Sequence, residues 1–398
     1  MHWILAATTA LLAGAATLQA QQPIDLDNLP NYASQPRPPF IRRDNTPPTN
    51  AITDAGATLG RVLFYDKRLS RNNTISCASC HHQDHGFADP AVASLGVSAT
   101  TGRHSMRLVN IRFGQDPRMF WDERAANTEA QATQPIRDHG EMGFSGTLGD
   151  PPFESLLEKL AATEEYPLLF ERAFGDATIT EDRMQRGLAQ FVRSIQSFDT
   201  KYDAGRLQAP NELPFPNFTQ AENNGKALFI EPPRFNPQGV RVGGGAGCQA
   251  CHRAPEFDID PTSLSNGVTG RIGGGVDATS RRSPSLRGMF AADGSQNGPF
   301  MHDGSLATLE AVVDHYDSIP SVVLDPGISP NIDPRLTPGG NPQRLNLTAQ
   351  QKADIVAFLR TLSGPAVETD ARWSDPYGPD GALDIVQLRG PATGWMLH

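Results

Sequence analysis

Apolar side chains recur at helical spacing in four stretches of the chain, two in each half. These stretches begin at Thr53, Thr180, Thr219 and Thr348. In two of them the apolar face is clear, with Met184, Leu188, Phe191, Val192 and Ile195 in the first half and Ile355, Val356, Phe358, Leu359 and Leu362 in the second. A threonine hydroxyl can cap the free amides of a helix N-terminus. The pattern predicts four helices that bury one face each.

Strand patterns are sparse, and the two halves of the sequence repeat one another. "TDAGATLGRVLFYD" near the start is echoed by "TQAENNGKALFI", and each is followed, after a loop, by Cys-x-x-Cys-His. "RHSMRLVNIRF" and "RRSPSLRGMF" then follow the two motifs. Such self-similarity indicates an internal duplication. We therefore expect a mainly α protein of two similar modules, with long irregular loops because proline (33) and glycine (37) are abundant.

Proline-rich stretches mark the expected domain boundaries. Residues 1–20 resemble a secretory signal peptide, because an apolar run from Ile4 to Leu18 is followed by small residues. The alternative is that this apolar run is an N-terminal membrane anchor. No later stretch of the sequence is apolar enough to span a membrane. After an extended lead-in at 21–50 we expect a first module at 51–205, a linker at 206–218 and a second module at 219–398.

The net charge of the chain argues against nucleic acid as a partner and agrees with a soluble protein. The net charge of the chain is −10 at pH 7, and no basic run occurs. Nucleic-acid-binding proteins carry a basic patch that meets the phosphates, so nucleic acid is not an expected partner. The leader and the charge together predict a soluble protein of the periplasm or cell envelope.

The four cysteines identify the expected cofactor. They form two Cys-x-x-Cys pairs, and each pair is followed directly by a histidine, His81 or His252. Disulfides or a zinc site would use the thiols but would not require a histidine at both places. In c-type haem attachment the two thiols bind the vinyl groups and the adjacent histidine ligates the iron. We therefore expect two covalently bound haem c groups, held by Cys77, Cys80, His81, Cys248, Cys251 and His252.

Two haems alone are compatible with an electron carrier, and one polar segment favours a catalyst instead. "FWDERAANTEAQATQPIRDHGEMGF" (120–144) places carboxylates and an amide in a loop-like setting. A catalyst needs a positioned acid or base beside an iron that is open on one side. A carrier needs no such group.

At this point the chain resembles the bacterial di-haem cytochrome c peroxidases, a family that includes the tryptophan-oxidising MauG enzymes. The matching motifs cover about residues 50–365 and include "LGRVLFYDKRLS", "FWDERA", "EMG", "RSPSLRG" and "FMHDGSLATLEAVVDHY". The resemblance implies that the His81 haem reacts with peroxide. It also implies that Glu141 is the acid/base, that Gln131 and Pro135 line the same pocket, and that Trp121 relays electrons between the haems.

The resemblance also implies a distal ligand and a calcium ion. Tyr316 stands where ordinary members carry a methionine, as in MauG-like members, with His315 and Met301 as rival ligands. Asn110 and the backbone carbonyls of Asn297 and Pro299 match the inter-domain calcium site of the family. Many members close the peroxide-reacting haem with a loop histidine, for which His85 and His104 are the candidates here, while His82 is expected at the surface.

These observations lead to a stated function with two alternatives. The first expectation is an exported oxidoreductase that reduces hydrogen peroxide, with electrons from a small cytochrome c or a cupredoxin. A MauG-like enzyme would instead use peroxide to oxidise a tryptophan on a partner protein. A non-catalytic di-haem carrier is the alternative from another class, and the pair Gln131 and Glu141 argues against it.

Overall fold

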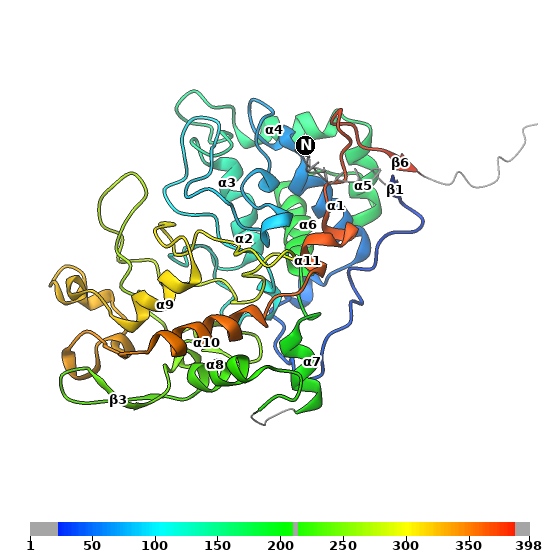
Figure 1. The fold of residues 1–398 in the computed structure, drawn as a ribbon. Coiled ribbons are helices and arrows are strands. Elements are labelled where there is room, and N and C mark those ends of the chain that lie inside the picture. Colours follow the sequence, from blue (N-terminus) through cyan, green and yellow to red (C-terminus); the bar gives the residue numbers. More distant parts are fainter. Residues whose placement is uncertain (1–22, 210–213, 387–398) are drawn as a thin grey trace, which may run out of the picture.

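The computed structural model describes residues 23–209 and 214–386, and it is mainly helical with few strands (Figure 1). The leader expected at residues 1–20 lies outside these residues. The helices of the first half are α1 (Asp54–Tyr65), α2 (Thr128–Ala132), α3 (Gln134–Arg137), α4 (Phe153–Ala161), α5 (Glu165–Phe174), α6 (Glu181–Ser194) and α7 (Lys201–Gln208). The second half contains α8 (Gln220–Ile230), α9 (Leu309–Asp317), α10 (Ala349–Arg360) and α11 (Ala366–Thr369).

The strands are short and form three two-stranded pairs. They are β1 (Ile24–Asp25) with β6 (Ile385–Val386), β2 (Pro233–Phe235) with β3 (Arg241–Gly244), and β4 (His252–Arg253) with β5 (Asp258–Ile259). Only the first pair is parallel, and it joins the two ends of the described chain. Long irregular connections, many with single turns of 3-10 helix, link the helices.

All four predicted helices are present, and a threonine caps each one. The side chains of Thr53, Thr180, Thr219 and Thr348 accept a hydrogen bond from an amide of the first turn. At Thr219 and Thr348 the third helical residue, Glu or Gln, also returns a bond to the cap, which completes a capping box. These local signals fix where α1, α6, α8 and α10 begin.

In each half one pair of long helices packs together at a glycine. The α1 backbone at Gly60 lies directly on the Gly187 carbonyl of α6, and the α8 backbone at Gly225 lies on the Asp354 carbonyl of α10. A side chain at either glycine would overlap that carbonyl, so both crossings require the smallest residue. Figure 1 shows α8 and α10 side by side in the lower half of the molecule, below α1 and α6.

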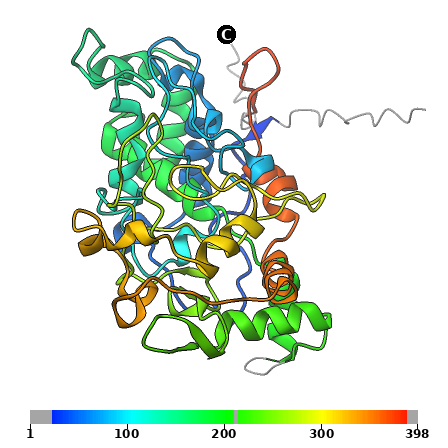
Figure 2. The same cartoon turned by 60° about the vertical axis from the view of Figure 1, so that its left-hand side comes forward.

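Two large apolar cores correspond to the two halves, with one difference from the expected division. The first core is built around Leu63, Phe64 and Phe191, and the second around Phe257 and Phe358. However, Trp373 and Val367, from the end of the chain, belong to the first core. Part of the expected second module, 219–398, therefore packs on the first half of the chain (Figure 2).

Three contacts hold this tail in place. The hydroxyl groups of Tyr32 and Tyr65 donate to the backbone carbonyls of Arg372 and Trp373, at 2.7 and 2.6 Å. The Trp373 indole donates to the Ser194 hydroxyl at 3.2 Å.

Within the described residues, every helix is too short or too polar to cross a lipid bilayer.

Candidate functional site

The first Cys-x-x-Cys-His motif is a tight turn that directs its side chains to one site. Cys77–Ser79 is a single 3-10 turn, and the amides of Cys80 and His81 both donate to the Cys77 carbonyl. Both thiols are free and half-buried, and burial raises the pKa of Cys77 to about 12. His81 Nδ1 bonds the Phe87 carbonyl at 3.0 Å. With Nδ1 as the donor, the Nε2 lone pair is left for a metal.

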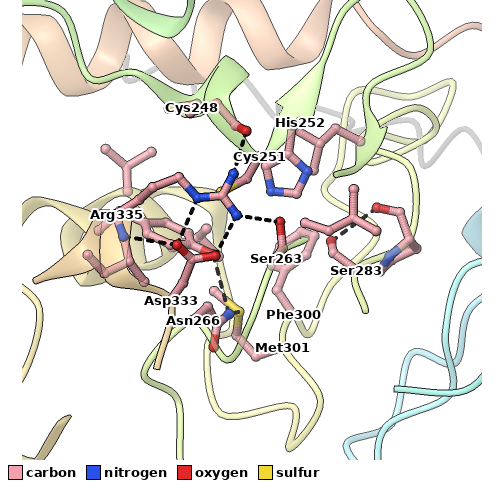
Figure 3. Close-up of a pocket in the computed structure, with 18 of the residues that line it drawn as sticks. Cys248, Cys251, His252, Ser263, Asn266, Ser283, Phe300, Met301, Asp333 and Arg335 are labelled. Carbon is pink, nitrogen blue, oxygen red and sulfur yellow. Dashed lines mark hydrogen bonds and ion pairs between the residues drawn. The ribbon is translucent and has the colours of Figure 1, made fainter. Parts of the chain in front are cut away.

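The second motif has the same turn and opens on a large cavity. Cys248–Ala250 is again a 3-10 turn, and the Cys251 amide donates to the Cys248 carbonyl. The cavity beside it measures about 430 Å³, and Cys248, Cys251 and His252 lie along one wall (Figure 3). Its other walls are mostly apolar, with Phe229, Leu264, Phe300, Val313, Leu345 and Leu359.

The residues around both motifs fit a haem. At each motif two free thiols and a half-buried imidazole stand within one turn, as covalent attachment requires. At the second, His252 Nδ1 is buried and has no hydrogen-bond partner among the described residues. An apolar cavity that contains a buried, unpaired nitrogen suits a flat apolar cofactor with a metal ion.

Tyr316 and Met301 line the same cavity as His252, and His315 is not among its lining residues. The Tyr316 hydroxyl accepts a hydrogen bond from the Asn266 side-chain amide at 3.3 Å, and the Met301 sulfur lies 3.2 Å from the same nitrogen. His315 Nε2 instead bonds the Asn266 carbonyl at 2.9 Å. Burial raises the pKa of the Tyr316 hydroxyl. Of the three candidate ligands, Tyr316 and Met301 therefore face the cavity.

The rim of this cavity carries a fixed charge pair beside the second motif. Arg335 forms an ion pair with Asp333 at 2.6 Å and donates to the Ser263 hydroxyl at 3.0 Å (Figure 3). It also donates to the Ala250 carbonyl at 2.8 Å, inside the Cys-x-x-Cys turn. Sequence reasoning missed Arg335, because nothing in the local pattern connects it with a motif about eighty residues earlier.

Glu141 is a half-buried carboxyl group beside the first motif. Burial, followed by the neighbouring Asp138 charge, raises the pKa of Glu141 to about 7. The Glu141 charge in turn raises the pKa of the Cys77 and Cys80 thiols, which places the carboxyl near both.

Two backbone bonds position Glu141. Its amide donates to Asp138 Oδ1 at 2.9 Å, and its carbonyl accepts from the Val97 amide at 2.9 Å. Gln131 lies on α2 and Pro135 on α3, just before this loop. The Gln131 side chain forms no hydrogen bond with the described residues, Glu141 included. The structure thus places Glu141 near the first Cys-x-x-Cys-His motif, whereas the Gln131 side chain has no hydrogen-bond partner among the described residues.

Trp121 stands where the two halves of the chain meet. Its indole nitrogen donates to the His104 carbonyl at 2.7 Å, and its own carbonyl accepts from the amides of Arg281 and Arg282. The indole ring packs edge-on against His302, with 6.2 Å between the ring centres. Trp121 also lines the cavity that contains the second motif. The sequence motif "FMHDGS" contains His302, but its contact with Trp121 depends on the tertiary fold.

The remaining histidines have protein partners. His85 Nε2 bonds the Gly298 carbonyl at 2.5 Å, and His104 Nδ1 bonds the Ala91 carbonyl at 3.1 Å. The His82 amide and the Ala88 carbonyl form part of an isolated bridge, and the side chain is half-buried rather than at the open surface. The gating role expected for His85 or His104 stays a prediction.

The groups expected to bind calcium have other partners. Both polar groups of the Asn110 side chain are used by Ser197: Oδ1 accepts from its amide at 2.8 Å, and Nδ2 donates to its carbonyl at 3.2 Å. The Asn297 carbonyl accepts from Arg107 Nη2 at 3.3 Å. The Asn297 side-chain oxygen is buried and has no hydrogen-bond partner among the described residues, and the calcium site expected from Asn110, Asn297 and Pro299 stays a prediction. No cluster of three or more His, Cys, Asp or Glu side chains suited to a metal ion occurs in residues 23–209 and 214–386.

Comparison with known proteins identifies the class. Residues 54–209 match the family model of the di-haem cytochrome c peroxidases. The methylamine utilization protein MauG of Methylophilus methylotrophus is 30% identical over 93% of this chain and 97% of its own. The cytochrome c551 peroxidase of Nitrosomonas europaea is 26% identical over 83% of this chain and 90% of its own.

Solved structures agree with this class. A MauG-like protein associated with microbial copper homeostasis has a TM-score of 0.66 and 28% identity, and the match covers 85% of this chain and 98% of that one. The diheme peroxidase BthA of Burkholderia thailandensis shares the fold, with a TM-score of 0.59 at 21% identity over 86% of this chain and 93% of its own. The chain therefore belongs to the di-haem cytochrome c peroxidase and MauG family, and it is an oxidoreductase with two haem cofactors.

Proposed function

We propose that the protein is an exported enzyme that reduces hydrogen peroxide at a haem c held by Cys77, Cys80 and His81. Electrons would reach it from a second haem c, held by Cys248, Cys251 and His252, through Trp121. The two modules would be the products of an internal duplication, which the matching Cys-x-x-Cys turns and glycine crossings support. Export to the periplasm is inferred from the apolar leader in the sequence.

The half-buried Glu141 carboxyl, with its raised pKa, is the observation that carries this proposal. A haem, when bound, supplies the iron that takes up peroxide and the electrons that reduce it. Cleavage of the O–O bond also needs a proton on the leaving oxygen, and a carboxyl with a pKa near 7 can both take up and release one. Glu141 would move a proton from one peroxide oxygen to the other, with the Gln131 amide as a hydrogen-bond partner. In total, two electrons and two protons convert one peroxide into two waters.

His81 and Trp121 have supporting roles. The bond from His81 Nδ1 to the Phe87 carbonyl fixes the ring orientation and raises the basicity of Nε2. Trp121 is held by hydrogen bonds at both its indole and its backbone, between segments of the two halves. A rigid aromatic ring in that place can pass electrons with little rearrangement. The donor would be a small cytochrome c or a cupredoxin.

Tyr316 favours a second candidate function, the oxidation of a tryptophan on a partner protein. Relatives named methylamine utilization protein MauG cover almost the whole chain. A tyrosinate from Tyr316 would be an anionic oxygen ligand, which stabilises oxidised iron. An enzyme that stores oxidising power for a protein substrate needs that stabilisation more than one that only discharges peroxide.

Spectroscopy of the haem-loaded protein tests the proposal. We expect one high-spin and one low-spin iron by EPR, and optical changes at both haems on addition of peroxide. Two low-spin irons that do not respond to peroxide would instead identify an electron carrier. A Glu141→Gln variant should lose about 10²–10⁴-fold in the rate of peroxide reduction, with both haems still attached. An undiminished rate would remove Glu141 from catalysis.

Reduced small cytochrome c and cupredoxin distinguish the two enzymatic candidates. Rapid oxidation of either protein in the presence of peroxide supports the peroxidase function. Peroxide consumption that leaves both donors reduced, together with a long-lived oxidised state of the two haems, supports the oxidation of a protein substrate.

A further inference from the structure

Asp150 is a buried carboxylate at the end of the loop that follows Glu141. Its side chain has no exposed surface. Arg71 Nη1 donates to Oδ1 at 2.6 Å, the Ser145 hydroxyl donates to Oδ2 at 2.7 Å, and His139 Nδ1 lies 2.9 Å from Oδ2. The bonds from Ser145 and then His139 hold the pKa of Asp150 below its usual value, so the group is charged at neutral pH. These bonds join the residues on either side of Glu141 to one another and to a distant segment.

Arg71 also lies against the turn that carries Glu141. Its amide donates to the Met142 carbonyl at 2.9 Å, and its stem packs on Gly143, where a Cβ would come within 2.6 Å of Arg71 Cδ. Gly143 has a φ of +78°, so the turn requires glycine for its backbone as well as for this close approach. Arg71 Nη2 donates to the Ser98 hydroxyl at 2.5 Å. One arginine thus contacts the turn through its backbone and stem, and a neighbouring loop through its guanidinium.

The loop that contains Ser98 holds the same turn through its backbone. The Val97 amide donates to the Glu141 carbonyl at 2.9 Å, and the Ser98 amide donates to the Gly140 carbonyl at 3.1 Å. Gly96 lies so close that a Cβ there would be 2.1 Å from the Gly140 carbonyl oxygen. Hydrogen bonds therefore fix the backbone of Glu141 and of the residue before it.

We propose that Asp150 is a positioning residue for Glu141, and that Arg71 is the link through which it acts. The pair would hold the turn against the loop that contains Ser98, so that the Glu141 carboxyl stays beside the first Cys-x-x-Cys-His motif. This inference rests on the proposed acid/base role of Glu141. Proton transfer requires close placement of the reacting groups, and a displacement of about 1 Å can cost about 10²-fold in rate.

Steady-state kinetics of the haem-loaded protein tests the proposal. Asp150→Asn and Arg71→Met should each lower kcat for peroxide reduction by about 10–100-fold, because Glu141 is no longer held in place. The KM for peroxide and the EPR spectrum should change little, since neither residue belongs to a haem motif. Arg71→Lys should restore part of the rate, because it keeps a cation with a single donor centre. Asp176→Asn is the matched control, since Asp176 also pairs with an arginine, Arg183, but is exposed.

Thermal unfolding gives a second readout, which needs no substrate. Burial is the main cause of the raised pKa of Glu141, ahead of the charges of Asp138 and Arg124. A turn that loosens should therefore let this pKa fall from about 7 toward 4.5. In the wild type, stability falls as pH rises through that window, because the unfolded chain releases the proton that the folded protein holds. Glu141→Gln escapes this loss and so gains in thermal midpoint over its parent.

The measurement is this gain in two backgrounds. We expect Glu141→Gln to gain on the wild type from pH 4.5 to 7.5, and to gain much less on Asp150→Asn. The comparison within the Asp150→Asn background cancels the effect of His139, which loses its carboxylate partner in both proteins compared. A full gain in that background would overturn the proposal, whatever the rates.

The outcomes separate this inference from the proposed function. If Glu141→Gln lowers the rate but Asp150→Asn and Arg71→Met do not, Glu141 acts without this support and the inference is wrong. If Glu141→Gln keeps the wild-type rate, the proposed function fails, and the thermal comparison alone decides the role of Asp150. If Asp150→Asn does not fold, Arg71→Met takes its place in both measurements, because the Arg71 side chain is 31% exposed.

Discussion

Glu141 is a carboxyl group whose surroundings favour the neutral form. Its pKa is raised to about 7 by burial and by Asp138, from an ordinary value of 4.5. An uncharged acid near neutral pH can donate a proton, and its conjugate base can recover one, so a small environmental shift gives a group for both directions of transfer. The same shift has a thermodynamic effect that can be measured without a substrate.

The stability of the wild type should depend on the titration of Glu141. Between pH 4.5 and about 7 the folded protein holds this proton and the unfolded chain releases it, so stability falls as pH rises through that window. Glu141→Gln cannot ionise and escapes this loss. Thermal unfolding should therefore show the variant gaining on the wild type from pH 4.5 to 7.5, with no further gain above. The exposed Glu171→Gln is the control, and parallel curves for Glu141→Gln would contradict the prediction.

Tyr316 and Met301 both line the cavity beside the second Cys-x-x-Cys-His motif, and substitution tests which of them binds the haem iron. Tyr316→Phe removes the hydroxyl that Asn266 contacts but keeps the ring, so the low-spin EPR signal of the second haem should change in g-values. Met301→Leu should leave that signal in place. The opposite pattern would make Met301 the ligand, and two unchanged spectra would exclude both side chains.

The helix crossings of the two halves depend on single glycines. Gly60 and Gly225 each lie against a backbone carbonyl of the partner helix, so an added methyl group must push the helices apart. Gly60→Ala and Gly225→Ala should each destabilise the protein by about 1–3 kcal/mol, as overpacking does. Gly327→Ala is the control, because a Cβ there meets nothing within 4 Å. Chemical denaturation measures all three, and equal stability would contradict the crossing geometry.

The sequence predicts these elements to the extent that their signals are local. Thr53, Thr180, Thr219 and Thr348 mark helix starts because capping involves only the next few residues. The Cys-x-x-Cys-His turns are local in the same way. In contrast, β1 and β6 are two-residue strands with no periodicity, and they pair across the whole chain. Distance along the chain, more than chemistry, limited the prediction.

The same limit applies to the site. The sequence named both Cys-x-x-Cys-His motifs, Glu141 and Trp121 as site candidates, and the resemblance implied the roles of the last two, which stay predictions. The contact of Trp121 with His302, and of Arg107 with the Asn297 carbonyl, depends on how two distant segments meet. The calcium expectation for Asn110 did not anticipate that Ser197 would use both groups of its amide.

At the scale of the whole molecule, the first core is completed by the end of the chain. Trp373 is 1% exposed and packs in that core. Trp373→Ala should cost about 3–5 kcal/mol, as for other buried large side chains, and should mainly affect the first half. Hydrogen exchange of α1 and α6 measures this, with Leu148→Ala, which is exposed, as the control. Increased exchange confined to α8 and α10 would contradict it.

The returning tail also sets an order of events during synthesis. A ribosome releases the chain from its N-terminus, so α1 to α6 emerge long before Trp373 and β6 exist. Until then the first half lacks the part of its core that Val367 and Trp373 supply, and its folding is complete only after the second half has been synthesised. The fold around His81 therefore reaches its final form only after the segment that contains His252 has been synthesised. A gene truncated between the two halves would therefore encode a first half whose core lacks Val367 and Trp373.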